Sequence, residues 1–470
     1  MAIDRRTGRR RTLAAAAAAV IGAAVGERRG PGAEPAPGWQ AGVARAVITP
    51  ETAVWLAGYG SKRAPDGVLH DLWMKALALR APDGTRAVLV TSDFQGVPAS
   101  MSDRVFAACE RLHGLGRAGL MITFSHNHCG PRLGDDLQDY YPVDADQARL
   151  VAEYTDLCVE RMTDLVGRAL ADLAPARLST GRDDCGFAVN RRANAEAEVP
   201  GMLAAGTPLE GPVDHDVPVL AVHRAGESGA LVAVLFGYAC HPTTLNFTTW
   251  CGDYPGFAQL AIEERHPGAA AMFVNTCGGD QNPLPRRSVE LCRKYGVELA
   301  DAVERALSRP LAPVAPALRT AYRSVELPWE AVVTRQELVA AAAEADSIKG
   351  RWGRRLLAKL DAGETFPTSA TYPCRAWRLG EGTLVLGMGA ETVVDYALRF
   401  KRAYGRDTWV CGYADDMLAY VPSRRVWEEG GYEGGAFLYE YGRPATRWAG
   451  DVEDRVAATI DALVRDVSER

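Results

Sequence analysis

The feature that most restricts how this chain can fold is an apolar run that ends in two histidines. Residues Leu120–Phe124 are apolar apart from Thr123, and His126 and His128 follow before a Gly-Pro pair. A short apolar run bounded by glycine and proline is typical of a buried strand. In an extended backbone, residues two apart point the same way, so we expect both imidazoles to face one side at the end of that strand.

Two imidazoles placed side by side have several uses. Both can bind a metal ion, or one can bind it while the other accepts and releases a proton. The alternative is a pair of hydrogen-bonded histidines at the mouth of a loop. A single His-x-His spacing is common and does not decide between these interpretations.

Other apolar runs along the chain also end in short polar clusters. These clusters contain Asp93, His241, residues 275–282, Glu391 and Tyr420. An α/β enzyme assembles its site from distant chain segments at the ends of strands. We therefore expect these clusters to share one cleft with the two histidines.

The periodicity of the chain predicts an α/β fold. The main expected elements are strands over 87–91, 120–124, 219–223 and 231–239 and helices over 101–115, 145–174 and 334–360. The first strand, helix and strand in this order indicate a parallel crossover, which places ligands at the carboxyl ends of the strands. We predict mixed β-sheets flanked by helices in one large catalytic domain over residues 39–470, with the site at strand ends.

The N-terminus reads as a targeting segment rather than as part of the fold. Basic residues up to Arg11 precede an apolar, alanine-rich run over 13–25, which is typical of an export signal. Arg10-Arg11 also resembles the twin-arginine type of signal. The run is too short to span a bilayer, so a membrane anchor is the weaker interpretation. We predict export to the periplasm or medium, with residues 1–38 as signal and linker.

Composition excludes several classes of function. The 470 residues carry a net charge of −6, so no nucleic-acid surface is indicated. None of the ten cysteines forms a CxxC pair, so a thiolate zinc site is not expected. Cys129, Cys240 and Cys277 stand beside candidate site residues, which leaves reactive thiols as an alternative. No segment beyond the leader is apolar enough to cross a membrane.

Three candidate residues have the chemistry of catalytic zinc ligands. Such a zinc takes about three nitrogen or oxygen ligands and keeps one position for water, and His126, His241 and Glu391 are of the right types. His128 could move the proton. Taken singly, His241 could cap a strand, Glu391 could favour a helix N-terminus, and Tyr420 could be an ordinary core residue.

The order and neighbours of these residues resemble the neutral/alkaline ceramidases, zinc amidases that cleave the amide of ceramide. Residues 125–131 are similar to that family's Ser-His-Thr-His-Ser-Gly-Pro, and the likeness runs in order from about Val43 to Tyr441. The other matching stretches are Gly58-Tyr59-Gly60, Asn190-Arg191, His241-Pro242-Thr243, Ala390-Glu391-Thr392, Tyr420-Val421 and Tyr432-Glu433-Gly434.

The resemblance implies roles for the residues that match. It implies that His126, His241 and Glu391 bind Zn²⁺ and that the oxygen of Tyr420 lies near the metal. It implies a catalytic role for His128. Arg191 matches an arginine that the family needs for activity.

The chain departs from the family pattern in two places. Asn282 stands where the family has a serine that is important in the site, and an asparagine cannot accept an acyl group, although its amide can hold a carbonyl or an oxyanion. The chain also ends shortly after the last motif, so we predict that it has no C-terminal β domain. Both departures bear on whether ceramide is the substrate.

We therefore predict a zinc-dependent hydrolase that cleaves a linear N-acyl amide by attack of metal-bound water. His128, Arg191 and Asn282 are the predicted catalytic residues. The expected partner is a small or lipid-like N-acyl substrate of sphingolipid type, and the oligomeric state stays open. Two alternatives are a zinc esterase or lactonase that uses the same site and an exported binding protein without catalysis.

Overall fold

A computed structural model describes residues 38–226 and 229–469. Residues Gly38–Arg470 form one compact unit. Apart from Gly38, the predicted export signal and linker, residues 1–38, lies outside the described residues, so export stays a prediction. Among the described residues, no helix combines the length and apolarity that crossing a bilayer requires.

The larger sheet has nine strands, and two of them, β5 and β9, end at the candidate site. In spatial order they are β11 (Ala270–Asn275), β9 (Leu231–Tyr238), β8 (Asp216–Arg224), β6 (Ala174–Asp184), β1 (Trp39–Val47), β3 (Trp73–Arg80), β4 (Arg86–Ser92) and β5 (Leu120–Phe124), with β13 (Ala312–Pro313) paired to β6. The β11–β9 and β4–β5 pairs are parallel and the others are antiparallel. The sheet is therefore mixed, as predicted.

A second sheet has four strands: β14 (Leu318–Pro328), β15 (Ser369–Leu379), β16 (Thr383–Met388) and β18 (Trp409–Cys411). One face packs against the larger sheet through apolar side chains such as Trp377, Trp409 and Met272. Its other face is covered by α8 (Val394–Tyr404) and α10 (Val452–Ser468).

The free face of the larger sheet is covered by four helices. These are α1 (Ala99–His113), α2 (Ala145–Ala171), α4 (Asp253–Arg265) and α5 (Val289–Leu307), which share one core with the strands. The core clusters therefore give layers in the order helix, sheet, sheet, helix. Strands such as β5 and β11 are buried along their whole length, as expected for a sheet that is covered on both faces.

Three strand–helix–strand crossovers determine where the site forms. They are β4–α1–β5, β9–α4–β11 and β16–α8–β18, and each joins two parallel strands. The first is the crossover that the sequence predicts. His126 follows β5, His241 follows β9 and Glu391 follows β16, so three carboxyl ends supply the site.

Three two-stranded pieces complete the sheets. β7 (Ala188–Asn190) pairs with β12 (Gln281–Pro283), β17 (Glu391–Thr392) pairs with β19 (Tyr420–Val421), and β2 (Gly67–Val68) pairs with β10 (Thr249–Trp250). In the parallel β17–β19 pair, Glu391 lies directly opposite Tyr420. These short pairings therefore place site residues from distant parts of the chain side by side.

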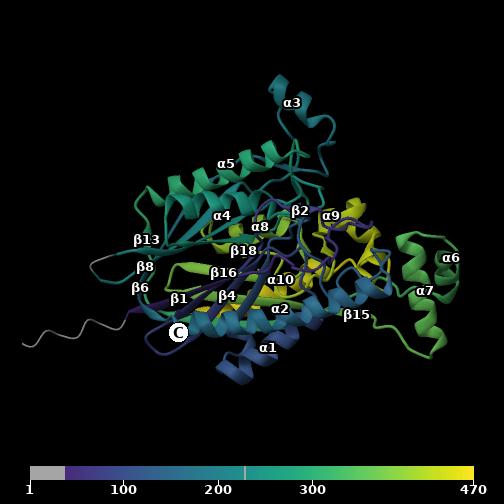
Figure 1. Ribbon diagram of the computed structural model, residues 1–470, viewed down its shortest axis with the longest axis horizontal. Coiled ribbons are helices and arrows are strands. Elements are labelled where there is room, and N and C mark those ends of the chain that lie inside the picture. Colours follow the sequence, from purple (N-terminus) through teal and green to yellow (C-terminus); the bar gives the residue numbers. More distant parts are fainter. Residues whose placement is uncertain (1–37, 227–228, 470) are drawn as a thin grey trace, which may run out of the picture. The chain divides into compact units, whose positions relative to one another are not determined.

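One expected element is wrong. The predicted single helix over 334–360 is two helices, α6 (Arg335–Ala342) and α7 (Ile348–Asp361), seen in green at one side of the sheets in Figure 1. The chain turns between them because Asp346 adopts a positive φ of 51° and the side chain of Ser347 caps α7 by accepting from Gly350 N. The remaining helices are α3 (Val199–Ala205) and α9 (Arg424–Glu429), with short turns η1 (Arg117–Gly119), η2 (Tyr432–Ala436) and η3 (Leu438–Tyr441).

Candidate functional site

Four side chains converge at the carboxyl ends of these strands. Oε2 of Glu391 lies 3.1 Å from Nε2 of His126 and 3.0 Å from Nε2 of His241. Nε2 of His128 lies 3.0 Å from Nε2 of His126. The three histidines form a group that could hold a metal ion, with ligand atoms within 4.8 Å of one another. His126, His241 and Glu391 are each 1% exposed, so the cluster is shielded from bulk water.

The hydrogen bonds on the far side of the rings decide which nitrogens face the centre. Nδ1 of His126 lies 2.7 Å from the carbonyl of Gln95, and Nδ1 of His241 lies 2.8 Å from the carbonyl of Gly278. A carbonyl can only accept, so each Nδ1 carries a proton, and in the neutral form of either ring the lone pair lies at Nε2. This arrangement of a ring N–H on a backbone carbonyl is the usual support for a metal-binding histidine.

Without a cation, these lone pairs face a carboxylate oxygen. Oε2 of Glu391 is buried and has no hydrogen-bond donor. Burial, together with the charge of Arg191, lowers the pKa of His241 to about 4, so this ring is neutral at pH 7. Two neutral nitrogens and a carboxylate oxygen that converge in this way fit a divalent cation of the zinc type.

The backbone at His126 differs from the extended chain that the sequence predicts. Strand β5 ends at Phe124, and His126 has a positive φ of 64°. The two rings therefore do not meet because they leave one face of a strand. They meet because a turn, held by the bond from Cys129 N to Oδ1 of Asn127 (2.8 Å), folds His128 back toward His126.

Glycine and alanine positions around the cluster explain two of the motifs. A Cβ at Gly58, whose φ is 97°, would lie 2.5 Å from the ring of His128, so the backbone can approach this ring only at a glycine. Ala390 has a φ of 66°, a region that favours glycine. This explains why the ceramidase pattern has glycine at that position.

Arg191 connects the cluster to a second set of polar groups. It donates to the hydroxyl of Tyr420 (2.9 Å), to Oδ1 of Asn282 (3.2 Å) and to Glu433 (2.7 Å). The Tyr420 hydroxyl in turn lies 3.0 Å from Nε2 of His241. The β7–β12 pairing produces this arrangement, because Asn282 lies opposite Val189 two residues before Arg191. All seven predicted site residues therefore lie in one connected network.

Sequence reasoning missed one residue that contacts the cluster directly. The hydroxyl of Tyr441 donates to Oε1 of Glu391 at 2.7 Å. Burial and the nearby Glu391 raise the pKa of Tyr441 well above its usual value, so the phenol stays protonated. No motif singled out Tyr441, because one tyrosine in an aromatic stretch carries no periodic or spacing signal. Glu433 was noted only as part of a motif, and its bond to Arg191 depends on tertiary structure.

The cysteines beside the site are poorly suited to nucleophilic chemistry. All ten cysteines are free and buried. Burial raises the pKa of Cys129, Cys240 and Cys277 well above the usual value, so their thiols stay protonated. This disfavours the reactive-thiol alternative. Asp93 also takes no part in the cluster, because its carboxylate accepts from Trp73 N at 2.8 Å.

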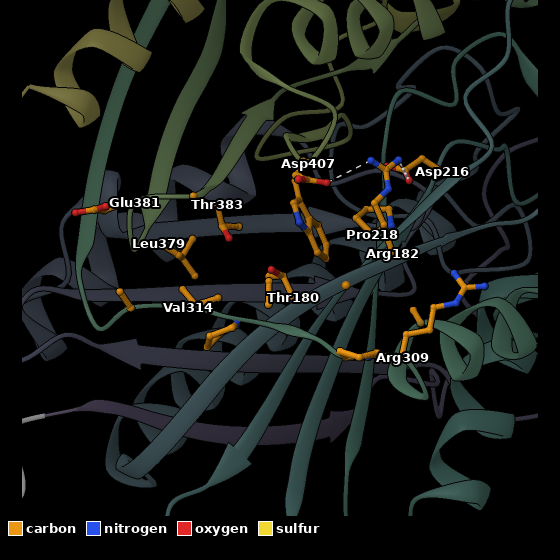
Figure 2. A pocket seen from close by; sticks show the side chains of 18 residues that line it. Thr180, Arg182, Asp216, Pro218, Arg309, Val314, Leu379, Glu381, Thr383 and Asp407 are labelled. Carbon is orange, nitrogen blue, oxygen red and sulfur yellow. Dashed lines mark hydrogen bonds and ion pairs between the residues drawn. The ribbon is translucent and has the colours of Figure 1, made fainter.

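Two cavities differ in their relation to the cluster. A cavity of about 450 Å³ is lined by Arg191, Arg192, Asn194, Glu196, Asn282, Arg286, Tyr432 and Glu433, so it opens beside the predicted catalytic residues. A larger cavity of about 560 Å³ lies elsewhere, among Thr180, Val314, Leu379 and Trp409 (Figure 2). Arg182 pairs there with Asp216 and Asp407, and no predicted site residue lines it. The smaller cavity is the candidate substrate pocket.

Comparison with known proteins defines the class of fold. No protein-family model and no curated protein sequence matches the chain. Among solved structures, a neutral ceramidase from Pseudomonas aeruginosa matches with a TM-score of 0.69 at 20% identity, over 92% of this chain and 74% of that one. A ceramidase complexed with C2 matches with a TM-score of 0.67 at 19% identity, over 91% and 76%. The resemblance seen in the sequence is thus confirmed at the level of the fold: this is a divergent chain with the ceramidase architecture.

Proposed function

We propose that this protein is a zinc-dependent hydrolase that cleaves a linear N-acyl amide. His126, His241 and Glu391 are the proposed zinc ligands, with Tyr420 beside them. The observation that carries the proposal is the convergence of Nε2 of His126 and Nε2 of His241 on Oε2 of Glu391, at 3.1 and 3.0 Å, with each Nδ1 on a backbone carbonyl. When bound there, zinc would supply Lewis acidity and a water of lowered pKa.

His128 is the proposed proton-transfer residue. Burial and the neighbouring His126 and His241 hold its pKa well below the usual value, so the ring is neutral and can accept a proton. It is the least buried of the three histidines. General bases of this kind contribute about 10²–10⁴-fold to a rate.

Arg191, Asn282 and Tyr420 are proposed to orient the substrate. An arginine can only donate, so the amide oxygen of Asn282 must face Arg191 and its Nδ2 becomes the donor that can reach a carbonyl or oxyanion. Burial raises the pKa of Tyr420 well above its usual value despite Arg191, so its phenol can donate as well. These three groups bind the substrate's carbonyl or oxyanion through hydrogen bonds and form no covalent bond with it.

The fold supports the same reaction class. The two similar structures are named as ceramidases, and the amide bond is the natural substrate of that class. We further propose that residues 39–470 form a catalytic domain and that residues 1–38 direct export. A lipid-like N-acyl substrate is part of the proposal.

One experiment separates this function from its alternatives. The protein is stripped of metal with a chelator, reconstituted with Zn²⁺, and assayed against matched N-acyl amides and esters of equal acyl length. We expect zinc-restored turnover of the amides. Turnover of esters or lactones alone would establish the esterase alternative, and zinc binding without turnover of either class would favour a binding protein.

A further inference from the structure

The substrate pocket beside the metal ligands is unusually polar for a lipid amidase. Its lining consists of three arginines, two glutamates, two asparagines and one tyrosine, with no aliphatic side chain. The long tails of a lipid would need apolar walls, because an unpaired charge cannot face hydrocarbon without a large cost. The half of the substrate that enters this pocket should therefore be polar.

The pocket already binds a carboxylate. Glu196, on the loop between β7 and α3, pairs with Arg286 through two bonds, from Nε at 2.7 Å and from Nη2 at 2.5 Å. This is the paired geometry in which a guanidinium recognises a carboxylate or a phosphate. The side chain of Glu196 is 46% exposed, whereas that of Arg286 is 12% exposed, so the acid can leave while the arginine stays in place.

Arg286 is fixed close to the reacting centre. Its Nη1 donates to Oγ1 of Thr243 at 3.0 Å, and Thr243 follows His241 by two residues. The adjacent Arg287 donates to the hydroxyl of Tyr59 at 2.8 Å, and the ring of Tyr59 lies 5.0 Å from that of His128. Arg286 therefore lies on the rim formed by the segments that carry two of the histidines.

The charges in the pocket favour an anion once Glu196 moves away. Glu433 pairs with both Arg191 (2.7 Å) and Arg192 (2.6 Å), and Arg192 also pairs with Glu429 (2.9 Å), so carboxylates match the charges of these two arginines. Arg286 has Glu196 as its carboxylate partner. A pair with an exposed acid contributes little stability, so an anion held in place by the rest of a bound substrate can replace it.

We propose that the amine half of the substrate carries a carboxylate, as in an N-acyl amino acid, and that Arg286 binds it in the position that Glu196 takes in the free protein. Glu196 acts as an internal competitor, and Arg286 determines specificity. This inference rests on the proposed amide hydrolysis and names the substrate class for that same site.

The test uses two substrates that differ mainly in charge. N-hexanoylglycine carries a carboxylate on the amine half, and N-hexanoylethanolamine carries a neutral hydroxyl at similar length. For the zinc-reconstituted protein, we expect kcat/KM to be higher for the glycine conjugate. In Arg286→Gln, KM for N-hexanoylglycine should rise about 10- to 100-fold, the range for losing a bond to a charged group, while KM for the neutral substrate stays unchanged.

Two further variants make the result specific. Glu196→Gln should lower KM for N-hexanoylglycine because the competing charge is gone, and it keeps the test valid if Arg286→Gln fails to fold. Arg309→Gln is the control, because Arg309 likewise pairs with a carboxylate, that of Asp183 at 3.2 Å, but lines the distant cavity of Figure 2. This substitution should change KM for neither substrate. Equal effects of Arg286→Gln or Glu196→Gln on both substrates would overturn the proposal.

A binding measurement separates this proposal from the proposed function. Calorimetric titration of N-hexanoylglycine into the zinc-loaded protein measures the affinity even if no turnover occurs. Binding that weakens at least about tenfold in Arg286→Gln supports the carboxylate site whatever the activity. Amide turnover with no difference in binding between the charged and neutral compounds would reject the carboxylate site while leaving the hydrolase function in place.

Discussion

Replacing Tyr441 with phenylalanine removes a hydroxyl that holds the carboxylate of Glu391, one of the three proposed zinc ligands. The hydroxyl donates to Oε1 of Glu391 at 2.7 Å, and it is the one donor to that oxygen among the described residues. A hydrogen bond to a charged group contributes about 1.5–3 kcal/mol. Because this bond also fixes the direction of Oε2 toward His126 and His241, its loss should weaken zinc binding by about 10- to 100-fold.

The assay is competition for zinc between the protein and a chromophoric chelator of known affinity, at constant pH. Tyr396→Phe is the matched control, because Tyr396 is also buried and donates to a carbonyl, that of Pro422 at 3.0 Å, but it does not contact the cluster. Both variants should lose some stability, and only Tyr441→Phe should lose zinc affinity. Unchanged zinc affinity in Tyr441→Phe, or an equal loss of affinity in Tyr396→Phe, would show that the bond from Tyr441 to Glu391 does not support zinc binding.

Three other perturbations test the roles of the two adjacent histidines, of Asn282 and of Asp136. His126→Ala should lose zinc and activity, whereas His128→Ala should keep zinc and lose about 10²–10⁴-fold in rate; metal stoichiometry and turnover decide, and loss of zinc in both variants would make both residues ligands. An acylating inhibitor should leave no adduct on residues 276–283 during turnover, because Asn282 replaces the serine; a mass-spectrometric adduct there would contradict a metal-dependent reaction. Burial raises the pKa of Asp136 from 3.8 to about 8, so the folded protein keeps a proton that the unfolded chain releases, and stability is lost as pH rises between these values. Asp136→Asn should remove this loss of stability, which is on the order of 4 kcal/mol at pH 7 because that pH lies about three units above 3.8. Urea unfolding at pH 4–8 measures it, and the same dependence of the unfolding free energy on pH in both proteins would contradict the prediction.

The sequence predicted the fold well where periodicity was strong. The strands at Leu120–Phe124 and Leu231–Tyr238 and the crossover through α1 match, because a buried strand must be apolar on both faces and a crossover helix must be amphipathic. The predicted helix over 334–360 failed at Asp346, since a local turn and a cap can interrupt an otherwise helical pattern. Asp346 and Ser347 are residue types that favour turns and helix caps, and they end a helix even where the surrounding pattern is helical.

The site was predictable only in part. His126, His241 and Glu391 stood out because rare residue types ended apolar runs. Their mutual distances depend on how three crossovers stack, which no local pattern encodes. Tyr441 and Glu196 are further examples, because their partners lie 50 and 90 residues away in the chain. The turn at His126 was missed because a positive φ at a histidine leaves no signal in the sequence.

The proposed function depends on His126, His241 and Glu391 binding one zinc ion. The most direct measurement is a crystal structure of the zinc-reconstituted protein with anomalous data collected on both sides of the zinc absorption edge. We predict one strong anomalous peak, about 2.0–2.2 Å from Nε2 of His126, Nε2 of His241 and a carboxylate oxygen of Glu391. A peak bound by other residues, or no peak at this cluster in the zinc-loaded protein, would contradict the account.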